Sequence, residues 1–217
     1  MTQVVRNYAF GGERISFLLH VPGDGGEDTR RKYPLILFLH GAGERGSDPH
    51  LIKNYGLPKL LDDDPFFPFI VVSPQCPTDK WWGYDNPLLM ALFEHVITHY
   101  LADDRRVYLT GASMGGYGTW SLASEYPGRF AAVVPVCGVA LQPPSQVCTL
   151  KETPIWAFHG MADTVVPPEQ TTLMIDALRA CGGDPKVTYV EGAGHDLGTT
   201  AYSDPALFTW MRQQTLA

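Results

Sequence analysis

Short apolar runs that stop at a glycine or a proline alternate along this chain with segments of helical periodicity. One run, YPLILFLHG at residues 33–41, is apolar at consecutive positions, which is typical of a strand buried on both faces of a sheet. Similar runs predict further strands at residues 67–74, 105–111, 130–138, 154–160 and 186–192. Apolar residues at helical spacing predict helices at residues 86–101, 114–127, 167–181 and 204–215. The alternation predicts an α/β fold with a mostly parallel central sheet flanked by helices.

The segment ISFLLHV at residues 15–21 differs from these runs because it alternates loosely and ends at PGDGG. This pattern predicts an antiparallel strand at an edge of the sheet. The chain has no internal repeat, no low-complexity segment and no shift in composition that would mark a linker. We therefore expect residues 1–217 to form a single domain, which is an ordinary size for an α/β fold.

The formal net charge of −7, without any basic run, argues against nucleic acid as a partner. No apolar stretch approaches the roughly 20 residues that cross a bilayer, so we expect no membrane span. The N-terminal MTQVVRNYAF carries polar and charged residues where a signal peptide has its apolar core. The chain as given is therefore expected to be cytoplasmic, although a secreted protein stripped of its leader, or a domain of a longer protein, would look the same. The sequence leaves the oligomeric state open.

The four cysteines, Cys76, Cys137, Cys148 and Cys181, have no C-x-x-C spacing, so neither a zinc ribbon nor a redox motif is indicated. In a domain of this size we expect them to be reduced and mostly buried. Cys137 and Cys148 flank a proline-rich loop, and whether these two form a disulfide is left open.

The strongest sign of chemistry is the stretch TGASMGGYGTW at residues 110–120. Its pattern Gly111-x-Ser113-x-Gly115 lies between a predicted buried strand and a predicted helix, which is the setting of a nucleophile elbow. Such a turn is crowded by neighbouring backbone, so small residues two positions before and after the serine avoid clashes. We predict that Ser113 is a nucleophile; a glycine-rich turn without chemistry is the alternative.

A serine hydroxyl is a weak nucleophile and needs a histidine base that an acid orients. Of the two histidines downstream of Ser113, His159 ends a predicted buried strand and is expected to be structural. His195 lies in EGAGHDLG after the last strand, and we predict that it is the base. We predict that Asp163, in HGMADTVVP after the penultimate strand, is the acid; its alternative role is a helix cap or turn residue.

Acyl transfer by such a serine needs backbone N–H donors for the developing oxyanion. The amide after the nucleophile belongs to Met114, and a second donor should come from a loop after an earlier strand. The loop LHGAGERGSD at residues 39–48 fits, and Ala42 is the expected donor, with its neighbouring glycines as alternatives. His40 precedes the serine in the chain, so we interpret it as an organiser of this loop rather than as the base.

The motifs HGAGERG, GASMGGYGTW, HGMADTVVP and GAGHD, in this order and spacing, resemble the α/β-hydrolase superfamily. More closely, they resemble the compact esterases related to polyhydroxybutyrate depolymerases, feruloyl esterases and dienelactone hydrolases. The resemblance runs from about residue 12 to the end of the chain and implies an α/β-hydrolase fold with a triad of Ser113, Asp163 and His195. We therefore expect residues 1–217 to form one catalytic domain. It is highly specific for fold and triad, but it does not indicate which ester is the substrate.

Many α/β-hydrolases carry a helical cap between two strands that correspond here to those flanking residues 139–153. This segment is too short for such a cap, so we expect a shallow, open cleft without a large cap domain. The loop QCPTDKWWGYDNP at residues 75–87 should face the same rim. We predict that Trp81 and Trp82, with Tyr84, stack on a sugar or an aromatic acyl group; packing beneath the long loop is the alternative for each.

Two further residue pairs, one charged and one of histidines, have spacings that can indicate a function. Glu44 and Arg45 either pair to brace the loop at residues 39–48 or form a solvated surface pair. His95 and His99 have the spacing of metal ligands on a helix, but the H-E-x-x-H pattern is absent, so no metal site is expected.

Together these residues predict a carboxylesterase that works through an acyl-serine intermediate and requires no cofactor and no metal. The expected substrate is a small-molecule or polymer-linked ester, with a short-chain or aryl acyl group or a polysaccharide-linked one. The alternatives are a serine peptidase of the prolyl-oligopeptidase type and a non-catalytic binding module with a hydrolase fold.

Overall fold

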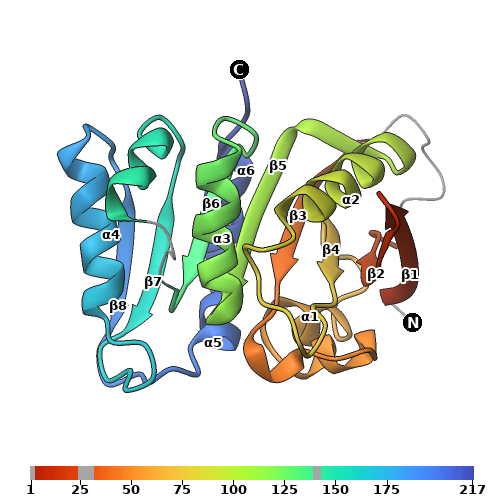
Figure 1. Cartoon of the computed structure of the whole chain (residues 1–217), viewed down its shortest axis with the longest axis horizontal. Helices are drawn as coiled ribbons and strands as arrows, with labels where there is room; N and C mark the ends of the chain where they lie inside the picture. Colours follow the sequence, from red (N-terminus) through yellow and green to blue (C-terminus); the bar gives the residue numbers. More distant parts are fainter. Residues whose placement is uncertain (1–2, 24–31, 139–142) are drawn as a thin grey trace.

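The computed structural model describes residues 3–23, 32–138 and 143–217. Among these residues, eight strands form one sheet in the order β1-β2-β4-β3-β5-β6-β7-β8 (Figure 1). They are β1 (Gln3–Phe10), β2 (Glu13–His20), β3 (Tyr33–Leu39), β4 (Ile70–Pro74), β5 (Ala102–Ala112), β6 (Ala132–Val136), β7 (Trp156–Gly160) and β8 (Lys186–Val190). β2 pairs antiparallel with β1 and with β4, and all pairings from β4 across to β8 are parallel. The mostly parallel sheet that the sequence predicts is confirmed.

The edge strand beside β2 corrects one expectation. β2 contains most of the segment predicted as an edge, yet it lies second in the sheet, and β1 forms the edge. The two strands join through Gly11 and Gly12, whose φ angles of 61° and 89° suit a tight hairpin turn. The sequence of β1, QVVRNYAF, mixes polar and apolar residues because this strand is largely exposed, so it lacks the apolar run of the inner strands.

Consecutive residues of β3 explain why the inner strands are apolar without alternation. Leu35, Leu37 and Leu39 belong to the core on one face of the sheet, whereas Ile36 and Phe38 belong to the core on the other. All five side chains are completely buried. A strand covered on both faces therefore needs an apolar residue at each position.

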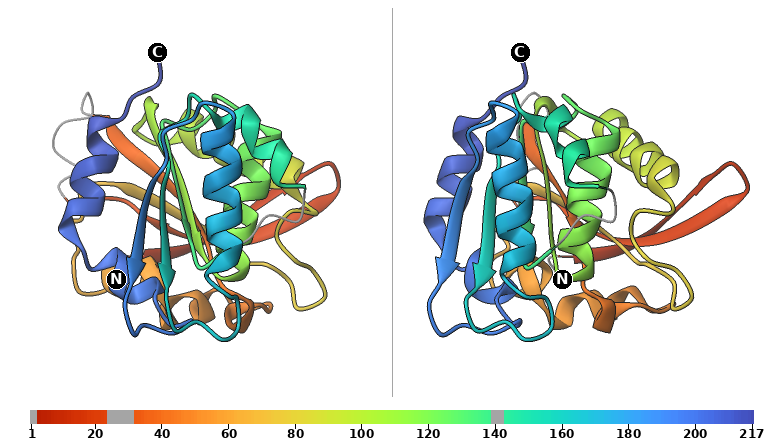
Figure 2. Two further views of the ribbon diagram at one scale, coloured as in Figure 1. Left: turned by 90° about the vertical axis from the view of Figure 1, so that its left-hand side faces the viewer. Right: turned by 60° about the vertical axis from the view of Figure 1, so that its left-hand side comes forward.

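Helices cover both faces of the sheet (Figure 2). The face seen in front in Figure 1 carries α2 (Asn86–His99), α3 (Met114–Glu125) and α4 (Glu169–Ala180), and the opposite face carries α1 (Gly56–Leu61), α5 (Gly198–Tyr202) and α6 (Pro205–Gln213). The four long helices were predicted, with ends that differ by a few residues. The short α1 and α5 were not predicted, because so few residues carry little periodicity. Within the described residues, no helix is long and apolar enough to cross a membrane.

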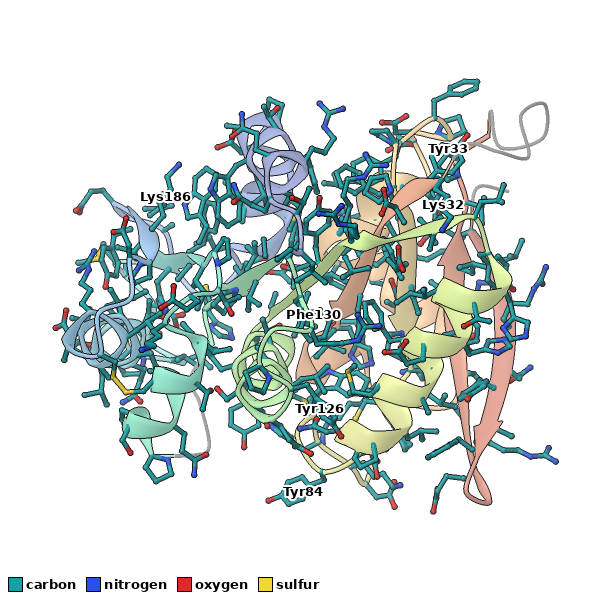
Figure 3. All side chains as sticks on the ribbon, turned by 90° about the horizontal axis from the view of Figure 1, so that it is seen from above. Lys32, Tyr33, Tyr84, Tyr126, Phe130 and Lys186 are labelled. Atoms are coloured by element: carbon teal, nitrogen blue, oxygen red, sulfur yellow. A yellow bond between two sulfur atoms is a disulfide. The ribbon has the colours of Figure 1, made fainter. Side chains whose placement is uncertain are left out.

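A disulfide joins Cys148 to Cys181, so the expectation of four reduced cysteines is wrong. Cys148 lies in the 3₁₀ helix η3 (Pro144–Leu150), and Cys181 follows the last residue of α4. The packing of η3 on α4 brings the Cα atoms of the two cysteines to 5.5 Å from each other. The bond is visible among the side chains in Figure 3. Cys137 and Cys76 are free and buried, which also answers the open question about Cys137 and Cys148.

Candidate active site

Ser113 lies at the turn between β5 and α3, where the backbone is strained. Its φ of 56° and ψ of −117° are unusual for a residue with a side chain. The neighbouring glycines are required by contact: a Cβ at Gly115 would overlap the Leu39 carbonyl, and one at Gly111 would overlap the carbonyl of Gly115. The turn thus presents the serine at the carboxyl end of β5, as the glycine spacing predicts.

The structure brings Ser113, His195 and Asp163 together although they are far apart in the sequence. Ser113 Oγ lies 2.7 Å from Nε2 of His195, and Nδ1 of the same ring lies 2.7 Å from Oδ2 of Asp163. Because a carboxylate only accepts hydrogen bonds, Nδ1 carries the proton and Nε2 is left to accept from the serine hydroxyl. The three residues follow β5, β8 and β7, whose carboxyl ends lie at one edge of the sheet.

Asp163 is held by a dense set of donors. Its side chain is fully buried, and Oδ1 accepts hydrogen bonds from the backbone amides of Val165 and Val166 at 2.9 Å each. Burial favours the protonated acid, but the bonds from His195 and from these amides outweigh it and hold the pKa of Asp163 below its usual value. The carboxylate therefore stays ionised at neutral pH and can orient His195.

The two expected oxyanion donors come from different elements near Ser113. Met114 is the first residue of α3, and Ala42 is the first residue of the 3₁₀ helix η1 (Ala42–Glu44). Ala42 lines an open cavity of about 420 Å³ together with Ser113 and His195; the rest of the lining is Gly41, Gly43, Glu44, Tyr55, Val165 and Asp196. The loop after β3 thus borders the Ser113 hydroxyl.

A model of the dienelactone hydrolase family matches residues 86–203, which is more than half of the chain. This chain belongs to the dienelactone hydrolase family. Feruloyl esterase B of Neurospora crassa is 25% identical over 244 aligned residues, covering 87% of this chain and 80% of that protein. The poly(3-hydroxyoctanoate) depolymerase of Pseudomonas fluorescens is 28% identical over 131 residues, covering 51% of this chain and 47% of that enzyme.

The crystal structure of a thermostable esterase superposes on this family member with a TM-score of 0.84 and 30% identity. The alignment covers 99% of this chain but 63% of that esterase, so the chain spans somewhat less than two thirds of it. These relatives support an ester hydrolase with an α/β-hydrolase fold, as the sequence motifs predict.

His40 organises the loop at residues 39–48 of this dienelactone hydrolase family member. Its Nε2 accepts the amide hydrogen of Cys76 at 3.0 Å, and its Nδ1 donates to the carbonyl of Gly41 at 2.7 Å. Burial is the main cause that lowers the pKa of His40 to about 4, so the ring is neutral at physiological pH. This arrangement agrees with the interpretation of His40 as a loop organiser.

The expectation that Trp82 contacts substrate is wrong. Its side chain is 3% exposed, its Nε1–H donates to the His40 carbonyl at 2.8 Å, and a Cβ at Gly118 would overlap it. Trp82 therefore packs beneath its loop, against α3. Tyr84 is 75% exposed and points away from the body of the protein (Figure 3).

Trp81 is 37% exposed and lies on the surface beside Arg45. The Arg45 guanidinium stacks 5.0 Å from the Trp81 ring centroid, and its nitrogens donate to the carbonyls of Ala42, Thr78 and Lys80. Arg45 thus ties the loop at residues 39–48 to the loop that carries Trp81, through backbone carbonyls; pairing with Glu44 was one of the two alternatives. Burial raises the pKa of Glu44, although the amide of Gly41 opposes this shift.

His159 contacts the acid, which sequence reasoning missed. Its Nε2 lies 2.8 Å from the carbonyl of Val166 and 3.2 Å from Oδ2 of Asp163, and its Nδ1 lies 2.6 Å from Oγ1 of Thr171. The side chain is completely buried. The structural role expected for His159 thus includes contact with the proposed triad. The signal that could have pointed to this role is the His-Gly pair that ends both this strand and the YPLILFLHG run.

Proposed function

We propose that this protein is a serine carboxylesterase in which Ser113 is the nucleophile, His195 the base and Asp163 the acid. The observation that carries the proposal is the continuous hydrogen-bonded chain from the Ser113 hydroxyl through His195 to the buried Asp163 carboxylate. We also propose that residues 1–217 form one catalytic domain, since all described strands belong to one sheet.

In the proposed reaction, Ser113 Oγ attacks the ester carbonyl carbon while its proton moves to Nε2 of His195. The carbonyl oxygen becomes an oxyanion that accepts hydrogen bonds from the amides of Ala42 and Met114. The intermediate collapses, the C–O bond breaks, and His195 gives the proton to the departing alcohol. Water then attacks the acyl-serine with His195 again as base, which releases the acid and restores Ser113.

The lining of the cavity favours small, uncharged acyl groups. Val165, 68% exposed, is the large aliphatic side chain at this opening, so a long acyl chain has little apolar wall to cover it. Each buried methylene contributes only about 0.8 kcal/mol, so chains beyond roughly four carbons should gain little. Besides His195 and Tyr55, the ionisable residues of the lining are the acids Glu44 and Asp196, which disfavour an acyl group with a free carboxylate. Trp81 is the aromatic surface that we propose for a feruloyl-type acyl group.

The test is hydrolysis of p-nitrophenyl esters from acetate to dodecanoate, with methyl ferulate beside them. We expect Ser113→Ala to abolish hydrolysis while the circular dichroism spectrum is unchanged, and retention of more than a small residual activity would refute the assignment. Wild type should prefer acetate and butyrate esters. Trp81→Ala should reduce turnover of methyl ferulate more than that of p-nitrophenyl acetate; equal losses would remove Trp81 from the acyl site.

A further inference from the structure

Cys137 brings a third metal-type ligand to the acid and base of the proposed triad. The Cys137 Sγ, a carboxylate oxygen of Asp163 and a ring nitrogen of His195 all lie within 4.8 Å of one another. Thiolate, carboxylate and imidazole are the ligands that Zn²⁺ and Cd²⁺ prefer, and three protein ligands with an open fourth position are a common zinc arrangement. Across the described residues, no other three such groups converge in this way.

The backbone fixes this convergence. Cys137, Asp163 and His195 follow the neighbouring strands β6, β7 and β8. Cys137 has a φ of 48°, which side-chain-bearing residues rarely adopt, and its amide donates to the carbonyl of Phe158 on β7 at 2.9 Å. The buried thiol is therefore carried on a fixed stretch of backbone. The proposed ester hydrolysis makes no use of it.

We propose that a thiophilic divalent cation such as Zn²⁺ binds Cys137, Asp163 and His195 and inhibits the enzyme. On binding, the Cys137 thiol loses its proton to solvent, and the thiolate and carboxylate together neutralise the two positive charges. His195 offers Nδ1, the nitrogen that faces Asp163, and the proton on Nδ1 moves to Nε2. A protonated Nε2 cannot accept the proton of Ser113, so the serine is no longer activated.

The proposal is tested by measuring how Zn²⁺ inhibits ester hydrolysis by the purified full chain. This test rests on the proposed function. Cys76→Ala is the matched control, because Cys76 is the other free and buried cysteine. We expect Zn²⁺ to inhibit wild type and Cys76→Ala equally, and we expect a chelator to restore the activity of both. Cys137→Ala should remain active and need at least about ten-fold more Zn²⁺, since even outer partners of a metal site contribute 10–100-fold to affinity. Equal inhibition of Cys137→Ala, or no inhibition of wild type, would overturn the proposal.

Cadmium binding to Ser113→Ala gives a readout that is independent of activity. Cd²⁺ bound to sulfur produces an ultraviolet thiolate-to-metal charge-transfer band, to which the paired His95 and His99 on α2 cannot contribute. We expect this band in Ser113→Ala and expect the additional Cys137→Ala substitution to abolish it. Absence of the band in Ser113→Ala contradicts the metal site, whatever the outcome for the esterase assignment.

Discussion

Two histidines, each followed by glycine, end two parallel strands on either side of Ser113, and they act on the proposed site by different means. His40, after β3, uses both ring nitrogens on backbone groups and so shapes the loop that carries the Ala42 amide. His159, in β7, contacts side chains as well: its Nδ1 is hydrogen-bonded to Oγ1 of Thr171, and its Nε2 lies 3.2 Å from Oδ2 of Asp163. The same dipeptide therefore supports a backbone donor on one side and a charged side chain on the other.

The largest effect is expected for Ala42→Pro, which removes the backbone amide that His40 is proposed to support as an oxyanion donor. Gly41 is extended at φ −74° and ψ 177°, as the residue before proline prefers, and proline suits the first position of a helix. The protein should therefore fold, and kcat should fall by about 100- to 1,000-fold. Ala42→Gly keeps the amide and should retain activity. A small loss in Ala42→Pro would assign the donor to a neighbouring residue.

His40 should make folding stability depend on pH. Its pKa is about 4 in the folded protein and about 6.5 when unfolded, so the folded state holds the neutral ring. Above pH ~6.5 the ring is neutral in both states, and the protein has its full stability. As the pH falls towards ~4, the unfolded chain binds a proton that the folded protein does not, which lowers the free energy of unfolding by about 3 kcal/mol in total. Urea unfolding between these pH values should show a smaller decline for His40→Gln than for wild type. Parallel curves for the two proteins would mean that His40 is not held neutral.

The contact of His159 with the Asp163 side chain predicts a smaller effect on kcat. His159→Leu removes the ring that donates to the Val166 carbonyl and whose Nε2 lies 3.2 Å from Oδ2 of Asp163. A neutral hydrogen bond contributes about 0.5–1.5 kcal/mol, so kcat should fall by at most about ten-fold, with KM nearly unchanged. Thr171→Val is the control, because it removes the other side-chain partner of His159 and leaves Asp163 untouched. Equal losses in the two variants would reduce His159 to a packing role.

Patterns local in the sequence predicted the sheet, the long helices and the convergence of Ser113, Asp163 and His195. The parallel sheet collects strand ends at one edge, so residues after different strands meet without further information. Contacts made by other parts of these elements were not predictable in this way. The burial of Trp82 depends on the absence of a side chain at Gly118, and the disulfide depends on how η3 packs against α4.

The Cys148–Cys181 bond has a consequence for the unfolded chain. It closes a loop with a sequence separation of 33 residues, and that loop contains Asp163 but neither Ser113 nor His195. Loop-closure entropy for this length amounts to roughly 3–4 kcal/mol of stabilisation in the chain-entropy description. The segment that carries the acid therefore has less conformational freedom to lose on folding than the segments that carry its two partners.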